Sequence, residues 1–416
     1  MGSLFTSYQT LAQKLVPWLA ASLVAIALVS PNGSQPAALL LFLVTFPLVF
    51  ARHREQPKVS RLWILMLVVP LLASIPLFIS SGTGEALAAG ARYFVAALVM
   101  LALTRIKLDP VLLLRSASAA GVLAVALNLH QLGEMRVNWG VGFLDSGYVS
   151  VLLLCLALAQ FHVDKGKPKW QIFAVLGIVC LIIAVAKTGT RGAWPAMIGV
   201  FAMQFVMLNV SRGRKILFAG VGIAVLALMI ITVPTVKNRI DLTVYEVKSY
   251  YQENNRTSSV GFRLDLWHIA LEGFIESPLW GVSFQRRSQI MDNYAKRHPD
   301  SASIGNDGRS SAHNEILNAL SKRGLLGALA VLLLYLVPMR YFVRFIRYGD
   351  VGVVSQLALA GTGLSITMIV CGITEAPLMN VRVGTTYAFM LVFLYHLVTS
   401  LHADYRSSSA GAQKRQ

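Results

Sequence analysis

Residues 171–191 read QIFAVLGIVCLIIAVAKTGTR, and this stretch sets the class of fold. Its apolar part belongs to a span, 170–188, that is long enough to cross a hydrocarbon core of about 30 Å as a helix. A second apolar span, 191–209, follows directly after Thr188-Gly189-Thr190. The pattern therefore predicts two membrane helices that are joined by a very short turn.

The composition extends this interpretation to the whole chain. Hydrophobic residues make up 56% of the 416 residues and charged residues only 13%, which is unlike a soluble globular protein. We predict an all-α integral membrane protein with about twelve transmembrane helices. The expected spans are 12–30, 36–51, 61–80, 86–104, 109–129, 142–161, 170–188, 191–209, 215–233, 322–342, 353–372 and 383–402.

One connection is far longer than the others, a polar insert between Val236 and Ala312. It is the main division of the chain, because apolar spans occupy nearly everything before and after it. The expected regions are 1–233 with nine spans, 234–312 as the large loop, 313–403 with three spans, and 404–416 as a tail.

The net charge of +18 indicates a topology rather than a nucleic-acid partner. Basic residues gather in alternate connections, whereas the short connections 31–34 and 80–84 carry none. This bias places both termini in the cytoplasm and the large loop on the outside, which for a bacterial inner membrane means the periplasmic face. The basic connections are those near residues 52–61, 105–107, 165–169, 212–215 and 340–347.

The large loop contains two helical patterns. In the first, Ile240, Val244, Val247 and Tyr251 form one apolar stripe, which predicts an amphipathic helix on the membrane or on the bundle. The second pattern, 262–274, ends before Pro278 and Gly281, which stop a helix. Arg263 stands near its start, where it is either a functional cation or a solvated surface charge.

Several basic residues lie in short connections on the expected outer side. Lys187 and Arg191 flank the tight turn, Arg136 follows the span 109–129, and Arg382 precedes the last span. A charge at the membrane is costly unless it reaches water or a partner, so these side chains are candidates for function. The alternative is an ordinary side chain that snorkels from a helix end to water.

His313 lies where the large loop re-enters the membrane. Ser310 and Ser311 are natural N-caps, which predicts that His313 occupies the first turn of the following helix. The helix dipole there disfavours imidazolium, so we expect a neutral ring that can accept a proton. A histidine that merely caps the helix or holds a hydrogen bond is the alternative.

The sequence predicts neither a metal nor a cofactor. It has no Asp-x-Asp pair in the large loop and no CxxC, HExxH or Walker motif in a supporting context. The three cysteines, Cys155, Cys180 and Cys371, all fall inside expected spans, where they are packing residues rather than disulfide partners.

Three segments together resemble the O-antigen ligase and polymerase superfamily of bacterial envelope enzymes. They are 188–193, which reads TGTRGA, the stretch from Arg263 to Val282, and 312–317, which reads AHNEIL, followed by Gly324-Leu325-Leu326-Gly327. The chain has threonines where relatives often have serines before the arginine. The resemblance implies a GT-C-like glycosyltransferase that moves a glycan from undecaprenyl pyrophosphate to a sugar hydroxyl of lipid A-core.

That reaction suits the candidate residues. A pyrophosphate leaving group needs its charge stabilised, and Arg191 and Arg263 can do so in place of a metal. His313 is the expected general base, and direct displacement predicts inversion at the anomeric carbon. We further expect the substrates to be bound by Arg136, Lys187, Arg286, Arg287 and Asn314.

Other functions remain open at this point. An O-antigen polymerase or a protein O-oligosaccharyltransferase of the same superfamily uses a similar donor with a different acceptor. A transporter of lipid-linked sugar belongs to another class, and it is disfavoured because few charges besides Arg92, Arg115 and Asp145 interrupt the spans.

Overall fold

The structure is a computed structural model, and the part of the chain that it describes is entirely helical, with 14 α-helices and two short 3₁₀ turns. Eight of these helices are long and apolar enough to cross a membrane, and α2 and α8 are apolar but shorter. An all-α membrane fold is therefore confirmed, while the count of twelve crossings stays a prediction. The described residues are 2–30, 32–50, 59–134, 136–137, 139, 142–207, 234–301, 308–346 and 352–413.

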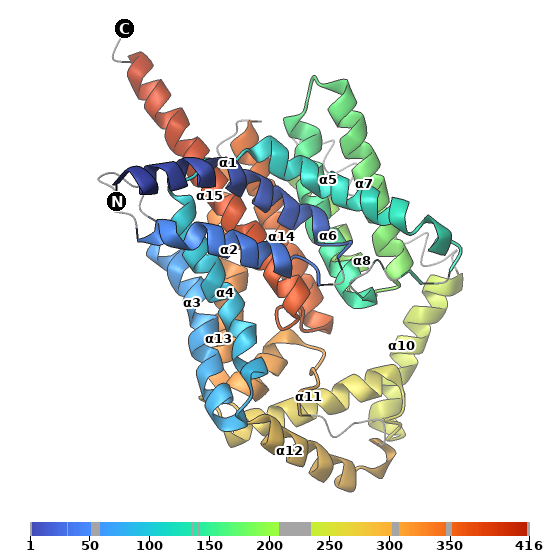
Figure 1. The fold of residues 1–416 in the computed structure, drawn as a ribbon. Helices are drawn as coiled ribbons and strands as arrows, with labels where there is room; N and C mark the ends of the chain where they lie inside the picture. Colours follow the sequence, from blue (N-terminus) through green and yellow to red (C-terminus); the bar gives the residue numbers. More distant parts are fainter. Residues whose placement is uncertain are drawn as a thin grey trace.

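Most of the helices form one bundle (Figure 1). Eleven of the twelve expected spans coincide with a helix, and the remaining one, 215–233, lies outside the described residues. The bundle consists of α1 (Gly2–Ile26), α2 (Gln35–Val49), α3 (Arg61–Ser81), α4 (Gly84–Leu103), α5 (Pro110–Leu127), α6 (Phe143–Val163), α7 (Pro168–Thr188), α8 (Ala193–Met207), α13 (Glu315–Ile346), α14 (Val353–Thr374) and α15 (Val381–Gln413).

Small residues let neighbouring bundle helices approach closely. A Cβ on Gly90 of α4 would lie 2.4 Å from the carbonyl oxygen of Pro70 on α3. A Cβ on Gly177 of α7 would lie 2.4 Å from the Cβ of Ser118 on α5. Such contacts are typical of membrane helices, whose association depends on close packing of backbones rather than on a hydrophobic driving force.

Two ion pairs join helices of the bundle. Arg115 binds Asp164 with two hydrogen bonds of 3.0 and 2.6 Å. Arg382 donates to Asp145 at 2.9 Å, which gives this basic residue a structural partner. These pairs lock helices to one another, because a charge in a low-dielectric setting is tolerated only beside its counterion.

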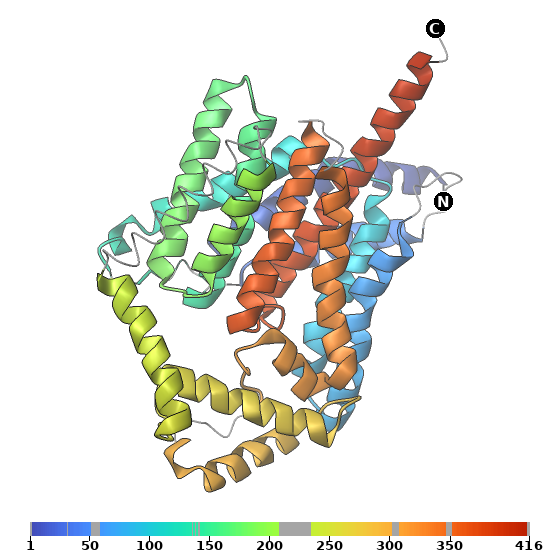
Figure 2. The ribbon, with the colours of Figure 1, turned by 180° about the vertical axis from the view of Figure 1, so that it is seen from behind.

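The large loop folds into three helices, α10 (Pro234–Gln252), α11 (Ser259–Glu276) and α12 (Phe284–Arg297), which we call the loop helices. They lie at one end of the bundle, whereas α1 begins and α15 ends at the opposite end (Figures 1 and 2). The sequence patterns predicted α10 and α11. They did not predict α12, which buries one face around Ile290, Met291 and Tyr294.

The apolar stripe of α10 does not face the bundle. Val244 and Tyr251 are exposed, whereas Ser249 and Tyr250, on the other face of the helix, are buried. Packing of this stripe on the bundle was one of the two options that the sequence left open, and it is wrong. The helix is instead held through its polar face, which carries Tyr250.

Asp265 joins the three loop helices. Its carboxylate is fully buried and accepts hydrogen bonds from Arg256 at 2.5 Å, from the hydroxyls of Tyr250 and Tyr294 at 2.8 Å each, and from Ser301 at 2.7 Å. We call these five residues the Asp265 network. Burial, followed by the contact with Asp265, raises the pKa of both tyrosines, so their hydroxyls stay protonated as donors.

Gly324 bends the chain where the loop enters the bundle. The residue has φ 61 and ψ −154 inside α13, where the expected helix was continuous. A Cβ there would lie 2.3 Å from the carbonyl carbon of Leu279, so the kink seats α13 against the turn that follows α11.

Candidate functional site

The tight turn between α7 and α8 forms as expected. Gly189 ends α7 with φ 64, a left-handed conformation that glycine adopts without strain. Thr190 fixes the turn, because its hydroxyl donates to the carbonyl oxygen of Phe143 at 3.0 Å and its N–H donates to the Thr188 hydroxyl at 3.2 Å. The threonines therefore shape the backbone that presents Arg191.

Arg136 lies across this turn. A Cβ on Gly189 would stand 2.8 Å from Nε of Arg136, so a side chain at this position would displace that of Arg136. The Val137 N–H donates to the carbonyl oxygen of Lys187 at 2.9 Å, which ties the two segments together. Lys187 itself turns outward and donates to the carbonyl oxygen of Glu134 at 3.2 Å.

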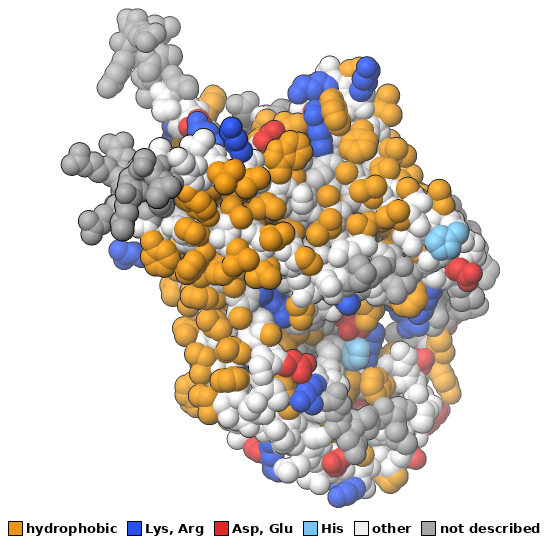
Figure 3. All heavy atoms as spheres, in the orientation of Figure 1, with side chains coloured by type: hydrophobic (Ala, Val, Ile, Leu, Met, Phe, Trp, Pro, Cys, Tyr) orange, Lys and Arg blue, Asp and Glu red, His pale blue; other side chains and the backbone are white. Residues whose placement is uncertain are grey.

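A cavity of about 560 Å³ opens beside the turn, between the bundle and α11. In Figure 3 a hollow lies between the bundle and the loop helices, and basic, acidic and histidine side chains gather in it. The cavity has a polar part and an apolar part. The polar lining includes Arg136, Tyr148, Thr190, Arg191, Arg263 and Glu375, and the apolar lining includes Phe143, Leu144, Pro195, Val370 and Ile373.

His313 joins this cavity through Glu375. Its Nδ1 lies 2.8 Å from each carboxylate oxygen of Glu375, and Glu375 also lies 3.7 Å from the guanidinium of Arg263. Since the carboxylate accepts from Nδ1–H, the neutral ring keeps its proton there and leaves Nε2 as the proton acceptor. The structure thus brings together Arg136, Arg191, Arg263 and His313, which come from distant parts of the sequence.

The expected position of His313 in the first helical turn is wrong. The helix α13 begins at Glu315, and Asn314 caps it by accepting from the Leu317 N–H at 3.0 Å. His313 precedes this cap with φ 48, a left-handed conformation that is uncommon for a residue with a side chain. The dipole argument therefore loses its geometric basis, and the contact that orients the ring is the one with Glu375.

Sequence reasoning missed two side chains of the cavity. Glu375 follows α14 in a short connection on the same side as the large loop, and only basic residues were sought there. Tyr148 lies on α6 and is 3% exposed, and its hydroxyl has no hydrogen-bond partner among the described residues. A buried donor without a partner is uncommon in native proteins, and here the residue that carries it lines a cavity.

The remaining expected substrate contacts lie elsewhere. Arg287 is fully buried and donates to the carbonyl oxygens of Gly308 and Ser310 at 2.9 and 2.5 Å. Arg286 pairs with Glu276, and this hydrogen bond lowers the pKa of that exposed carboxyl. The Asn314 amide donates to the carbonyl oxygen of Ile373 at 3.2 Å. None of the three is among the residues that line the cavity.

The cavity is suited to an anion. Three arginines and one carboxylate line it, and guanidinium binds phosphate oxygens in a bidentate manner. The apolar wall beside them can take a hydrocarbon chain. Across the described part of the chain, no three His, Cys, Asp or Glu side chains come together as a metal site would require.

Comparison with known proteins finds a family match that includes Arg191, Arg263 and His313. Residues 176–332 match the family model described as O-antigen ligase. An uncharacterized protein of Haemophilus influenzae is 26% identical over 212 residues, which cover 49% of this chain and 53% of that protein. An O-antigen ligase of Escherichia coli is 25% identical over 239 residues, 56% of this chain and 55% of that protein. The matched segments span about half the length of these curated relatives.

Proposed function

Because this chain carries a domain of the O-antigen ligase superfamily, we propose that it is a membrane glycosyltransferase. It transfers O-antigen polysaccharide from undecaprenyl pyrophosphate to a sugar hydroxyl of lipid A-core. The reaction takes place at the periplasmic face of the inner membrane and is a metal-independent displacement with inversion.

One observation carries this proposal. Arg191, Arg263 and Glu375 line a single cavity and Glu375 contacts His313, although these residues come from the α7–α8 turn, from α11, and from the segments after α14 and before α13. Anion-binding groups and a proton acceptor thus stand side by side at the end of a membrane bundle. A displacement whose leaving group is a lipid pyrophosphate needs both at that place.

The arginines act on the donor. As the bond between the anomeric carbon and the pyrophosphate oxygen breaks, negative charge develops on that oxygen, and Arg191 and Arg263 stabilise it. Arg136 adds a third cation, and the Tyr148 hydroxyl supplies a hydrogen bond from the cavity wall. The apolar wall formed by Phe143, Val370 and Ile373 faces the prenyl chain.

His313 acts on the acceptor. Its Nε2 takes the proton of the attacking sugar hydroxyl while the oxygen forms the new bond to the anomeric carbon. Glu375 holds Nδ1–H, so it keeps the acceptor nitrogen directed away from itself and stabilises the imidazolium that forms. Attack opposite to the leaving pyrophosphate, with no covalent intermediate on the protein, inverts the anomeric configuration.

The lipopolysaccharide of a deletion strain tests the proposal. We expect core without O-antigen, together with accumulated lipid-linked polymer, and restoration by the wild-type gene but not by His313→Ala. A core that bears a single repeat unit would indicate a polymerase instead. Unchanged lipopolysaccharide together with loss of glycan from a secreted protein would indicate protein O-glycosylation. Either of these two results contradicts the assignment of lipid A-core as the acceptor.

A further inference from the structure

Three consecutive residues at the start of α13 bond to one short segment that covers the end of α14 and the turn after it. The side chain of His313 reaches Glu375, that of Asn314 reaches the carbonyl oxygen of Ile373, and that of Glu315 accepts from the Leu378 N–H at 2.7 Å. The first contact belongs to the proposed catalytic pair. The other two contacts have no role in the chemistry, so we ask which part of the backbone they hold in place.

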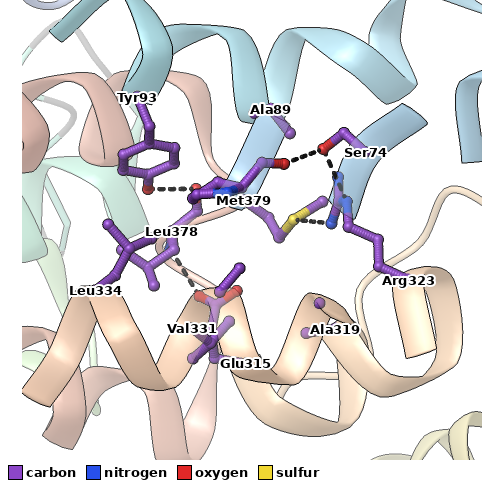
Figure 4. A pocket seen from close by; sticks show the side chains of 14 residues that line it. Ser74, Ala89, Tyr93, Glu315, Ala319, Arg323, Val331, Leu334, Leu378 and Met379 are labelled. Carbon is purple, nitrogen blue, oxygen red and sulfur yellow. Dashed lines mark hydrogen bonds between the residues drawn. The ribbon is translucent and has the colours of Figure 1, made fainter. Parts of the chain in front are cut away.

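Leu378 is held on both sides of its backbone. While Glu315 accepts from its N–H, the Tyr93 hydroxyl of α4 donates to its carbonyl oxygen at 3.1 Å. Figure 4 shows both side chains converging on Leu378 from different helices, beside Met379 and Arg323. Both contacts are fully buried, which makes each of them costly to leave unmade.

The turn that these contacts hold has little structure of its own. It connects the end of α14 at Thr374 to the start of α15 at Val381. Within it, the Met379 N–H donates to the carbonyl oxygen of Ala376 and the Asn380 N–H to that of Pro377, each at 3.2 Å. The place of the turn in the bundle is therefore set by side chains from other helices.

Buried cations complete the arrangement. Arg92 of α4 donates to the carbonyl oxygen of Asn380 at 2.7 Å, and Arg323 of α13 donates to the hydroxyl of Ser74 at 3.2 Å. A fully buried carboxylate such as Glu315 is expensive even beside cations, and a well-packed apolar side chain often stabilises as much. The Leu378 N–H, by contrast, needs a hydrogen-bond acceptor at this position, which an apolar side chain does not provide.

We propose that Glu315 and Tyr93 are positioning residues, which clamp Leu378 and thereby fix Glu375 beside His313. The proposal rests on the proposed function, since it assigns these residues a role in the same reaction. Glu375 lies only three positions before the clamped Leu378. A turn that moves by about 1 Å would break the contact between Glu375 and the ring, and such displacements cost up to about 100-fold in turnover.

A double-mutant cycle with Glu375 tests the clamp in the purified full-length protein. We expect Tyr93→Phe to lower kcat by about threefold to tenfold, because it removes a single hydrogen bond and no volume. Glu315→Gln keeps an acceptor oxygen but not the charge, so the contact with the Leu378 N–H weakens, and we expect a loss no greater than that of Tyr93→Phe. In a Glu375→Gln background each change should cost less than about twofold more, because residues that act through one another are not additive.

Asp164→Asn serves as the matched control. It breaks another buried ion pair of the bundle, with Arg115, that has no contact with the turn. It should lower the melting temperature with little change in kcat, and its effect should multiply with that of Glu375→Gln. If Tyr93→Phe keeps wild-type turnover, or if its loss multiplies with Glu375→Gln as the control does, the clamp is refuted. Tyr93→Phe decides the question even where Glu315→Gln fails to fold.

Hydrogen exchange separates failure of the clamp from failure of the proposed function. Amides of residues 373–380 should exchange faster in Tyr93→Phe than in the wild type, whatever the substrate. Faster exchange in a protein without ligase activity would leave the clamp in place and reject the ligation chemistry. Unchanged exchange would reject the clamp even if ligase activity is found.

Discussion

Glu375 and Asp265 are both carboxylates beside an arginine, yet their surroundings differ. Asp265 is fully buried and accepts from Arg256, from two tyrosines and from Ser301. Glu375 keeps 13% of its side chain exposed, lies 3.7 Å from Arg263, and shares a cavity of about 560 Å³ with it. In the first case four donors of the protein surround the carboxylate, whereas in the second the cations line an open cavity. The same residue types thus build a fixed joint in one place and a binding site in the other.

The largest effect is expected at the proton acceptor. His313→Ala should lower kcat by about 10²–10⁴-fold, because it removes the base that takes the acceptor proton. The melting temperature should stay near that of the wild type, since the side chain is partly exposed and only Glu375 loses a partner. Transfer assays with the purified protein measure kcat, and thermal unfolding measures the melting temperature. Near-normal turnover would remove His313 from the chemistry and leave the ring as a structural contact.

A substitution in the Asp265 network should lower stability and leave turnover unchanged, the opposite of the result expected for His313. Asp265→Ala leaves a buried guanidinium and three hydroxyls without their acceptor, which we expect to cost about 3–5 kcal/mol of stability. Limited proteolysis of residues 234–301 and the melting temperature report this loss. Molecules that remain folded should keep their turnover, because no member of the network lines the proposed site. Loss of turnover without loss of stability would contradict the distinction between the two carboxylates.

Arg191→Lys separates a guanidinium from a plain positive charge. We expect a loss of about 100-fold in turnover, because an ammonium group cannot bind phosphate oxygens in a bidentate manner. Arg297→Lys is the matched control on α12, where Arg297 pairs with the exposed Glu272. It should be nearly silent, as exposed ion pairs contribute little. Equal effects of the two substitutions would demote Arg191 to a snorkelling side chain.

A smaller effect is expected for Tyr148→Phe. The substitution removes the hydroxyl of a residue that lines the cavity, and with it the proposed hydrogen bond to the donor, so the loss in kcat/KM should be about threefold to tenfold. The melting temperature should not fall, since the hydroxyl has no protein partner among the described residues. A destabilised variant with unchanged kinetics would show that this hydroxyl serves packing instead.

Removal of divalent metals should have no effect. With arginines in place of a metal, turnover in excess chelator should equal that of the untreated enzyme. The assay compares chelated protein with and without added Mg²⁺. Loss of activity that Mg²⁺ restores would overturn the proposed role of Arg191 and Arg263.

Much of the fold could be predicted from local sequence. Long apolar runs specify membrane helices because every backbone polar group must be satisfied within the segment. The stops at Pro278 and Gly281 also act locally, and α11 ends at Glu276 as expected. The helix α12 was missed, because its buried face includes Arg287, whose partners are carbonyl oxygens more than twenty positions along the chain.

The site was predictable only in part. Arg191 is recognisable because it is a charged residue in a very short turn between two spans. Arg263 is recognisable because it belongs to one of the family motifs. The start of α13 was misplaced, because Ser310, Ser311 and Asn314 are all good caps, and the choice depends on contacts with Ile373 and Leu317. Glu375 gives no local signal, since its role depends on a ring some sixty positions away.

By itself, the sequence determined that this chain crosses a membrane many times and that a single large loop and a cation-bearing turn interrupt it. These features follow from composition and spacing, which act within a few residues. Only the tertiary structure decided that Glu375 orients His313, that Tyr148 borders the cavity, and that Arg287 belongs to the framework. Hydrogen bonds and burial between distant segments exist only once the helices have packed, so no local pattern can specify them.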